Sequence, residues 1–132
     1  MTGDLDTLEI RPDPGELARM REFVRMCADR DGLPESECFQ AQFVATEAVT
    51  NAIRHGLREN AQERPILVRC HTGRDGFMIE VGDEGRFRHR EPSTPEDTSG
   101  RGLGLIERFT RRFDLETSDR GTKLRMLVGG IA

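Results

Sequence analysis

The chain has 132 residues, of which 24 are acidic and 20 are basic, so its formal net charge is -4. This length suits one domain with a real hydrophobic core, and we expect residues 1–132 to fold as a single unit. The negative balance provides none of the positive field that neutralises a phosphate backbone. The composition therefore argues against direct binding to nucleic acid.

Cysteine usage and hydropathy indicate the compartment. Cys27, Cys38 and Cys70 lack the paired spacing of a zinc site and the density of a disulfide scaffold, so we expect reduced thiols. No apolar run approaches the roughly 18 residues of a membrane span. The opening residues, MTGDLD, lack the basic and apolar regions of a signal peptide. These features predict a soluble cytoplasmic protein without a membrane segment.

The first part of the chain changes from strand to helix periodicity. Residues 5–11 alternate apolar and polar side chains, which predicts a strand with one solvent-facing side. Asp13, followed by Pro14, is suited to begin a helix, because its carboxylate can accept from free N–H groups. We expect this helix to end at Gly32. Its apolar stripe consists of Leu17, Met20, Val24 and Cys27.

A second helix is predicted from about Pro34 to about Glu59. On a helical wheel, one side gathers small and branched apolar residues: Ala45, Ala48, Val49, Ala52 and Ile53. The other side carries Glu47, Asn51 and Arg54. A solvated polar stripe is the simplest interpretation, but so many apolar neighbours favour a helix that is partly covered on both sides. A buried carboxylate needs a partner, and a metal-bound ligand would supply one.

The remaining chain predicts two hairpins separated by a loop and a helix. Residues 65–72 and 76–81 are strand-like and joined by a glycine-containing turn. Residues 83–99 are polar and contain prolines, which indicates a loop. Residues 102–112 are helical in pattern, with Leu103, Ile106 and Phe109 directed inward. The last strands run from about 113 to 117 and from about 122 to 128. Such grouping predicts an α+β fold with helices on one face of a mostly antiparallel sheet.

Asp83 and Gly85 form a candidate base-recognition site at the end of a predicted strand. A carboxylate there can accept a hydrogen bond from the exocyclic amine of a base, while the glycine lets the ring approach the backbone. The alternative is an ordinary turn, because Asp and Gly are common in turns.

Gly100, Gly102 and Gly104 precede a predicted helix at alternate positions, which favours an anion site over a simple flexible loop. A helix terminus contributes only about 0.3–1 kcal/mol per charge, and up to about 2 kcal/mol, which is too little for a triphosphate. A divalent ion must therefore neutralise part of the triphosphate charge. Magnesium prefers oxygen ligands and keeps several waters, so the amide oxygen of Asn51 together with phosphates would suffice.

These segments together resemble a family over nearly the whole chain. Residues 47–55 (EAVTNAIRH) look like the N box, residues 83–85 (DEG) the G1 box and residues 100–106 (GRGLGLI) the G2 box of the GHKL ATPase superfamily. Residues 46–51 (TEAVTN) and the closing strand at Gly121 look most like the bacterial anti-sigma-factor serine kinases. The resemblance implies a Bergerat-type fold, a two-layer α/β sandwich with helices on one face of a mixed, mostly antiparallel sheet.

The resemblance also implies a role for each matching residue. Asn51 would hold Mg²⁺, Asp83 would bind the adenine amino group, Gly85 would admit the base and Thr122 would support the adenine end. The ATP phosphates would be wrapped by Gly100, Arg101, Gly102, Leu103, Gly104 and Leu105. Glu47 would be the catalytic base. Phosphoryl transfer requires a carboxylate that orients the attacking hydroxyl, and Glu47 lies one turn from the metal ligand.

The implied activity is an ATP-dependent protein-serine kinase that acts as an anti-sigma factor. It would phosphorylate a serine on an anti-anti-sigma protein and sequester a sigma factor. Related proteins often form homodimers through their N-terminal region, so the resemblance also implies a possible homodimer. Two alternatives share every motif: a non-catalytic nucleotide-gated binding module and a phosphatase-activating relative. The commoner G1 pattern has a second glycine where this chain has Phe87, a relaxation often found in the anti-sigma subgroup.

Overall fold

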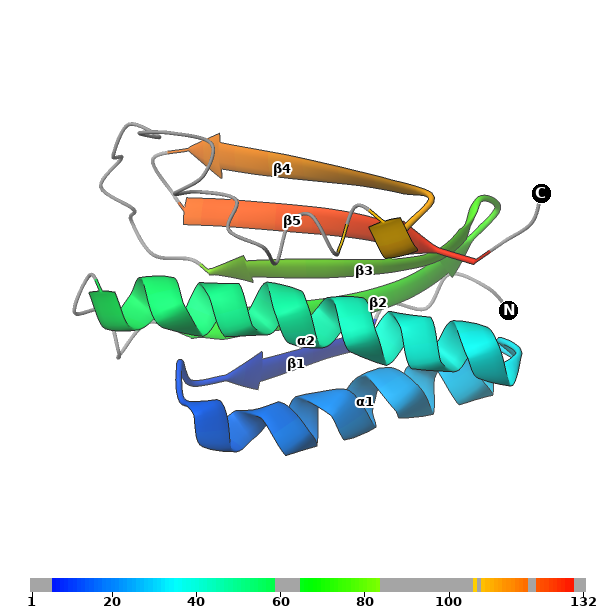
Figure 1. Cartoon of the computed structure of the whole chain (residues 1–132), viewed down its shortest axis with the longest axis horizontal. Coiled ribbons are helices and arrows are strands. Elements are labelled where there is room, and N and C mark those ends of the chain that lie inside the picture. The colour runs from blue at the N-terminus through cyan, green and yellow to red at the C-terminus, as the bar shows by residue number, and fades with distance from the viewer. Residues whose placement is uncertain (1–5, 59–64, 84–105, 107, 119–120, 130–132) are drawn as a thin grey trace.

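The structure, a computed structural model, describes residues 6–58, 65–83, 106, 108–118 and 121–129. Two helices lie side by side on one face of a five-stranded sheet, which gives two layers (Figure 1). In chain order the elements are β1 (Asp6–Ile10), the 3-10 turn η1 (Pro14–Glu16), α1 (Leu17–Arg30), α2 (Glu35–Arg58), β2 (Ile66–Gly73), β3 (Gly76–Asp83), β4 (Arg112–Ser118) and β5 (Gly121–Val128).

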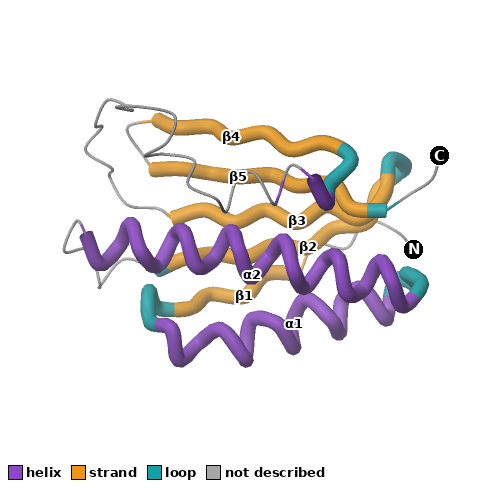
Figure 2. The backbone as a smooth tube through the Cα atoms, in the orientation of Figure 1, coloured by secondary structure: helices purple, strands orange, loops and turns teal. Residues whose placement is uncertain are grey.

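The sheet has the strand order β1-β2-β3-β5-β4, and each neighbouring pair is antiparallel. The expected α+β sandwich with helices on one face is therefore confirmed. The described strands form a purely antiparallel sheet rather than a mixed one. α1 packs on β1 and β2, while α2 packs mainly on β3 and β5 (Figure 2). The last strand in the chain, β5, thus lies inside the sheet beneath α2.

Local sequence signals explain where the first helix begins and ends. The Asp13 carboxylate accepts a hydrogen bond of 2.9 Å from the backbone N–H of Gly15, as expected for a helix cap. The turn that it caps is 3-10, and the α-helix starts afterwards, at Leu17. Gly32 follows α1 with φ +80°, a left-handed conformation that glycine adopts without steric cost.

The core lies between the helices and the sheet. The inward side of α2 is buried at Ala41, Val44, Ala45, Ala48, Val49 and Ile53. It packs with alternate residues of the central strands, including Ile66, Val68, Phe77, Ile79 and Val81. The alanines keep this side of the helix flat and allow it to approach the sheet closely. The apolar stripe predicted for the second helix is confirmed, although Ala52 is only partly buried.

The third predicted helix ends earlier than its pattern indicated. Ile106, Arg108 and Phe109 are helical, but β4 has already begun at Arg112, so the prediction of helix to residue 112 is wrong. Tertiary contacts explain the change. The backbone N–H of Arg111 donates to the carbonyl of Leu127 at 2.9 Å, which draws this segment beside β5.

Phe109 is also placed differently from the expectation. Ile106 is fully buried, but Phe109 is 40% exposed and rests against Phe43. Leu103 lies outside the described residues. The strand predicted over 76–81 continues to Asp83, so this residue ends β3 rather than starting a loop.

The face of the sheet away from the helices carries charged residues that pair across strands. The Arg125 Nε lies 2.9 Å from a Glu80 carboxylate oxygen, and Arg69 lies 3.7 Å from the same carboxylate. Such cross-strand pairs suit a solvent-facing sheet surface. Among the described residues, no helix is both long and apolar enough to cross a membrane.

Candidate functional site

The candidate site lies where the second half of α2 crosses the end of β3 and the start of β5. α2 packs on both strands, and its C-terminal end lies at the same end of the sheet as these strand termini (Figure 1). Asp83 and Thr122 are direct cross-strand neighbours. The fold thus brings together the strand ends that the sequence assigned to adenine and the helix that carries Glu47 and Asn51.

Glu47 and Asn51 are one helical turn apart and therefore project side by side. Both residues are half-buried, whereas Arg54, further along, is exposed. Their neighbours Ala48 and Val49 are buried against the core. This is the partly covered polar row that the sequence predicted.

Neither Glu47 nor Asn51 has a side-chain hydrogen bond or ion pair within the described part of the chain. Half-buried carboxylate and amide groups without protein partners are available to a ligand. The Asn51 amide supplies an oxygen atom, the donor type that Mg²⁺ prefers. Asn51 therefore fits a magnesium ion carried by a phosphate ligand, and the Glu47 carboxylate beside it stays available to a second substrate.

Asp83 is positioned by strand register. It has the same parity as the buried Ile79 and Val81, so its side chain belongs to the helix-covered face of the sheet. Its neighbour Thr122 on β5 shares that face. Both residues are half-buried. The carboxylate and the hydroxyl therefore belong to the face of the sheet on which α2 lies.

Gly82, the residue before Asp83, lets β3 and β5 approach each other closely at the end of β3. A Cβ added at Gly82 would lie 3.1 Å from the carbonyl oxygen of Thr122, which is tighter than most real contacts. The missing side chain thus helps to place Asp83 beside Thr122.

The glycine-rich part of the predicted site lies outside the described residues. This applies to Gly85, Gly100, Arg101, Gly102, Leu103, Gly104 and Leu105. Their roles toward the base and the phosphates stay predictions. Among the residues that are described, no group of three or more His, Cys, Asp and Glu side chains is arranged to hold a metal ion.

The clearest charge pairing lies away from this site, around α1. Arg30 Nη2 approaches an Asp6 carboxylate oxygen at 2.5 Å, and this hydrogen bond holds the pKa of Asp6 below its ordinary value. Asp6 also accepts a hydrogen bond from the Cys27 thiol at 3.7 Å. A hydrogen bond with Cys27 and burial raise the pKa of the Cys70 thiol, which favours its protonated form.

Sequence reasoning missed a cluster of phenylalanines beside the polar row. The rings of Phe43 and Phe109 meet edge to face, with centroids 5.1 Å apart and planes at 71°. Phe39, Phe43 and Glu47 follow one another at intervals of four residues. That spacing was the signal that could have identified the cluster.

Comparison with known proteins identifies the family. A family model described as a histidine kinase-like ATPase domain matches residues 10–128, nearly the whole chain. The chain therefore belongs to the histidine kinase-like ATPase domain family, and this membership implies a nucleotide-binding domain of the ATP-using type. Among curated proteins, none matches the sequence.

Two solved structures share the fold. The crystal structure of the RsbU and RsbW domains of Rv1364c from Mycobacterium tuberculosis aligns with a TM-score of 0.72 and 17% identity, covering 95% of this chain and 32% of that chain. This chain thus spans about a third of that protein's length. The SiaB-SiaC complex from Pseudomonas aeruginosa aligns with a TM-score of 0.68 and 14% identity, covering 93% of this chain and 88% of that chain. At these identities the likeness concerns the fold.

Proposed function

We propose that this protein is an ATP-dependent protein-serine kinase that acts as an anti-sigma factor. It phosphorylates a serine on an anti-anti-sigma protein and, in an alternative complex, sequesters a sigma factor. The observation that carries the proposal is the unpaired, half-buried pair of Glu47 and Asn51 on the helix that covers the central strands of a histidine kinase-like ATPase fold. The solved relatives, which include an RsbW domain and a SiaB-SiaC complex, support the same class of partner-switching regulator.

The nucleotide would be held by residues from three elements. Asp83 on β3 binds the adenine amino group, Thr122 on β5 supports the same end of the base, and Asn51 on α2 holds Mg²⁺. When bound, the ion neutralises part of the phosphate charge. Gly85 and the segment from Gly100 to Leu105 enclose the base and the phosphates.

Glu47 acts on the acceptor rather than on the nucleotide. Its carboxylate receives a hydrogen bond from the serine hydroxyl and takes the proton as the oxygen attacks the terminal phosphorus. The new bond is the phosphoserine ester, the bond that breaks joins the terminal phosphorus to its bridging oxygen, and ADP leaves with that oxygen. Because no protein group occupies Glu47 within the described residues, the carboxylate is free for this task.

The test is a transfer assay. Purified protein is mixed with labelled ATP, magnesium and each anti-anti-sigma-type protein encoded in the source genome, and phosphoserine is located by mass spectrometry. Glu47→Ala is expected to lower the transfer rate by about 10² to 10⁴-fold, the usual contribution of a general base. The rise in melting temperature with magnesium and ATP is expected to persist, because Glu47 does not hold the nucleotide.

Glu22→Ala is the matched control, because Glu22 is exposed on α1 and has no ion pair among the described residues. Intact transfer by Glu47→Ala would remove Glu47 from the mechanism. A wild-type protein that binds ATP and an acceptor but forms no phosphoserine would instead be a nucleotide-gated binding module or a phosphatase activator. A cytoplasmic location and homodimerisation through the N-terminal region belong to the same proposal, and light scattering tests the dimer.

A further inference from the structure

An exposed aromatic patch, formed by Phe39, Phe43 and Phe109, lies on the outer side of the molecule. Phe39 is 65% exposed and Phe109 is 40% exposed, and the ring of Phe43 contacts that of Phe109. Phe39 precedes Phe43 by one helical turn, which places neighbouring side chains about 5–6 Å apart at Cβ. Contiguous exposed apolar side chains commonly mark a surface that another molecule covers.

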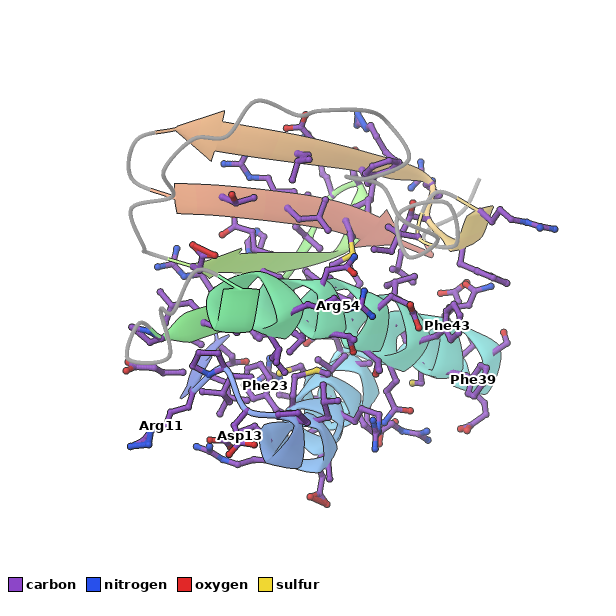
Figure 3. All side chains as sticks on the ribbon, turned by 60° about the vertical axis from the view of Figure 1, so that its left-hand side comes forward. Arg11, Asp13, Phe23, Phe39, Phe43 and Arg54 are labelled. Carbon is purple, nitrogen blue, oxygen red and sulfur yellow. The ribbon has the colours of Figure 1, made fainter. Side chains whose placement is uncertain are left out.

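The aromatic patch is continuous with the proposed catalytic residues. Phe39, Phe43, Glu47 and Asn51 occur at intervals of four residues on α2, so they form one gently turning row. At 1.5 Å per residue, Phe39 lies about 12 Å from Glu47 along the helix axis, and Phe43 lies about 6 Å from it. Figure 3 shows Phe39 and Phe43 toward the N-terminal end of α2 and Arg54 further along the helix. A protein seated on the aromatic patch would therefore reach Glu47 within one turn.

Arginines lie on both sides of Phe109 in the chain, at positions 108 and 111, and the turn that carries Arg74 and Asp75 lies beside Arg111. Arg108 and Arg74 are exposed and have no ion pair within the described ranges of the chain. Arg111 donates to the carbonyl oxygens of Asp75 at 2.6 Å and Gly129 at 3.2 Å, so no carboxylate in the described part of the chain neutralises it. The positive charges of these three arginines are therefore not offset by ion pairs among the described residues, although the net charge of the chain is -4. The border of the aromatic patch is complementary to acidic side chains.

We propose that the aromatic patch is the docking surface for the acceptor protein. The acceptor presents apolar side chains bordered by carboxylates beside its serine. The apolar side chains cover Phe39, Phe43 and Phe109, the carboxylates face Arg74, Arg108 and Arg111, and the serine hydroxyl meets Glu47. This inference rests on the proposed kinase function and names the surface by which that kinase selects its substrate.

The experiment measures transfer kinetics for Phe39→Asp against the anti-anti-sigma-type proteins of the source genome. The variant is expected to raise the KM for the acceptor at least about 10-fold, since central aromatic contacts dominate interface energies. Its kcat at saturating acceptor and its melting-temperature rise with magnesium and ATP should match the wild type. Arg108→Glu is expected to raise the same KM by a smaller factor and to reduce its salt dependence.

Met26→Asp is the matched control, because Met26 is 62% exposed on α1, outside the aromatic patch. It should leave the KM unchanged. Circular dichroism verifies folding, and the double variant Phe39→Ala, Phe109→Ala provides a test without a new charge and should raise the KM in the same direction.

The outcomes separate this inference from the kinase proposal. An unchanged KM for Phe39→Asp and for the double alanine variant overturns the docking surface and leaves the kinase intact. If Phe39→Asp dissociates a homodimer while the KM stays constant, the aromatic patch is covered by a second copy and the inference is wrong. If the wild-type protein neither binds nor phosphorylates any acceptor, the kinase proposal fails and the docking surface fails with it.

Discussion

The helices α1 and α2 lie side by side on the same face of the sheet but differ in how their charged and polar side chains are paired. On α1 three arginines have carboxylate partners: Arg19 with Glu16, Arg25 with Asp29 and Glu35, and Arg30 with Asp6 and Asp31. The exposed Arg21 and Glu22 of the same helix have no ion pair among the described residues. On α2 the described polar residues Glu47, Asn51 and Arg54 have none. We infer that the ion pairs of α1 serve the fold, whereas Glu47 and Asn51 on α2, which are half-buried and have no partner among the described residues, serve a ligand.

The largest effect expected from this comparison concerns the stability that α1 provides. Met20 is fully buried between α1 and its neighbours, so Met20→Ala should lower the free energy of unfolding by about 2–5 kcal/mol. ATP affinity of the folded protein should not change. Urea denaturation measures the first quantity and calorimetry the second. Met26→Ala, which removes an exposed methionine from the same helix, should have little effect on either.

A substitution on the polar side of α2 should instead weaken ATP binding and leave the stability of the protein nearly unchanged. Asn51→Ala should weaken magnesium-dependent ATP binding by at least about 10-fold, the loss typical for disturbed metal sites. The free energy of unfolding without ligand should hardly change, because the Asn51 amide has no hydrogen bond among the described side chains. Calorimetry of ATP binding with magnesium and with EDTA separates the magnesium-dependent part of the affinity from the magnesium-independent part. Gln40→Ala, another half-buried amide on α2, is the control. Equal magnesium dependence in both variants would contradict the assignment.

The smallest expected effect is a pH-dependent one at Asp6. A hydrogen bond from Arg30, the charge of Arg30 and the contact from Cys27 hold the pKa of Asp6 below its ordinary value of 3.8. A carboxylate whose pKa is lower in the folded state stabilises the protein above its unfolded pKa, and this stability disappears as the pH falls through the folded pKa.

Asp6→Asn should therefore lower the free energy of unfolding near neutral pH by less than about 1 kcal/mol. The difference from the wild type should shrink as the pH falls from about 4 through the lower pKa of the folded state, below which the wild-type carboxylate is protonated in both states. Urea denaturation at neutral and acidic pH measures it. Glu9→Gln on β1, exposed and without an ion pair among the described residues, should show no such change. A pH-independent difference would mean that Asp6 acts through packing alone.

The sequence predicted the elements that depend on local patterns. A helix from about Pro34 to about Glu59 is observed as Glu35–Arg58, because its alanines and branched residues repeat at helical spacing. The end of the following helix was wrong, since Arg111 is placed by hydrogen bonds to Asp75, Leu127 and Gly129, residues distant in the sequence. No local pattern carries such contacts.

The candidate site likewise contains one part that local sequence patterns predict and one part that depends on contacts between distant segments. The neighbouring positions of Glu47 and Asn51 follow from helical periodicity alone. The pairing of Asp83 with Thr122 depends on β5 inserting next to β3, and only the family resemblance linked these residues beforehand. Phe109 was expected in the core by its spacing from Ile106, but in the fold it rests on Phe43 at the surface.

The outermost position of β4 has a consequence for behaviour at high concentration. The edge of a sheet offers unpaired backbone groups to other molecules and can seed fibrils. On β4 the alternate residues Arg112, Asp114 and Glu116 are exposed and carry charges of both signs. A second chain adding to this strand would have to accommodate them at close range. We therefore expect these three side chains to act as gatekeepers against aggregation, independently of any role in binding.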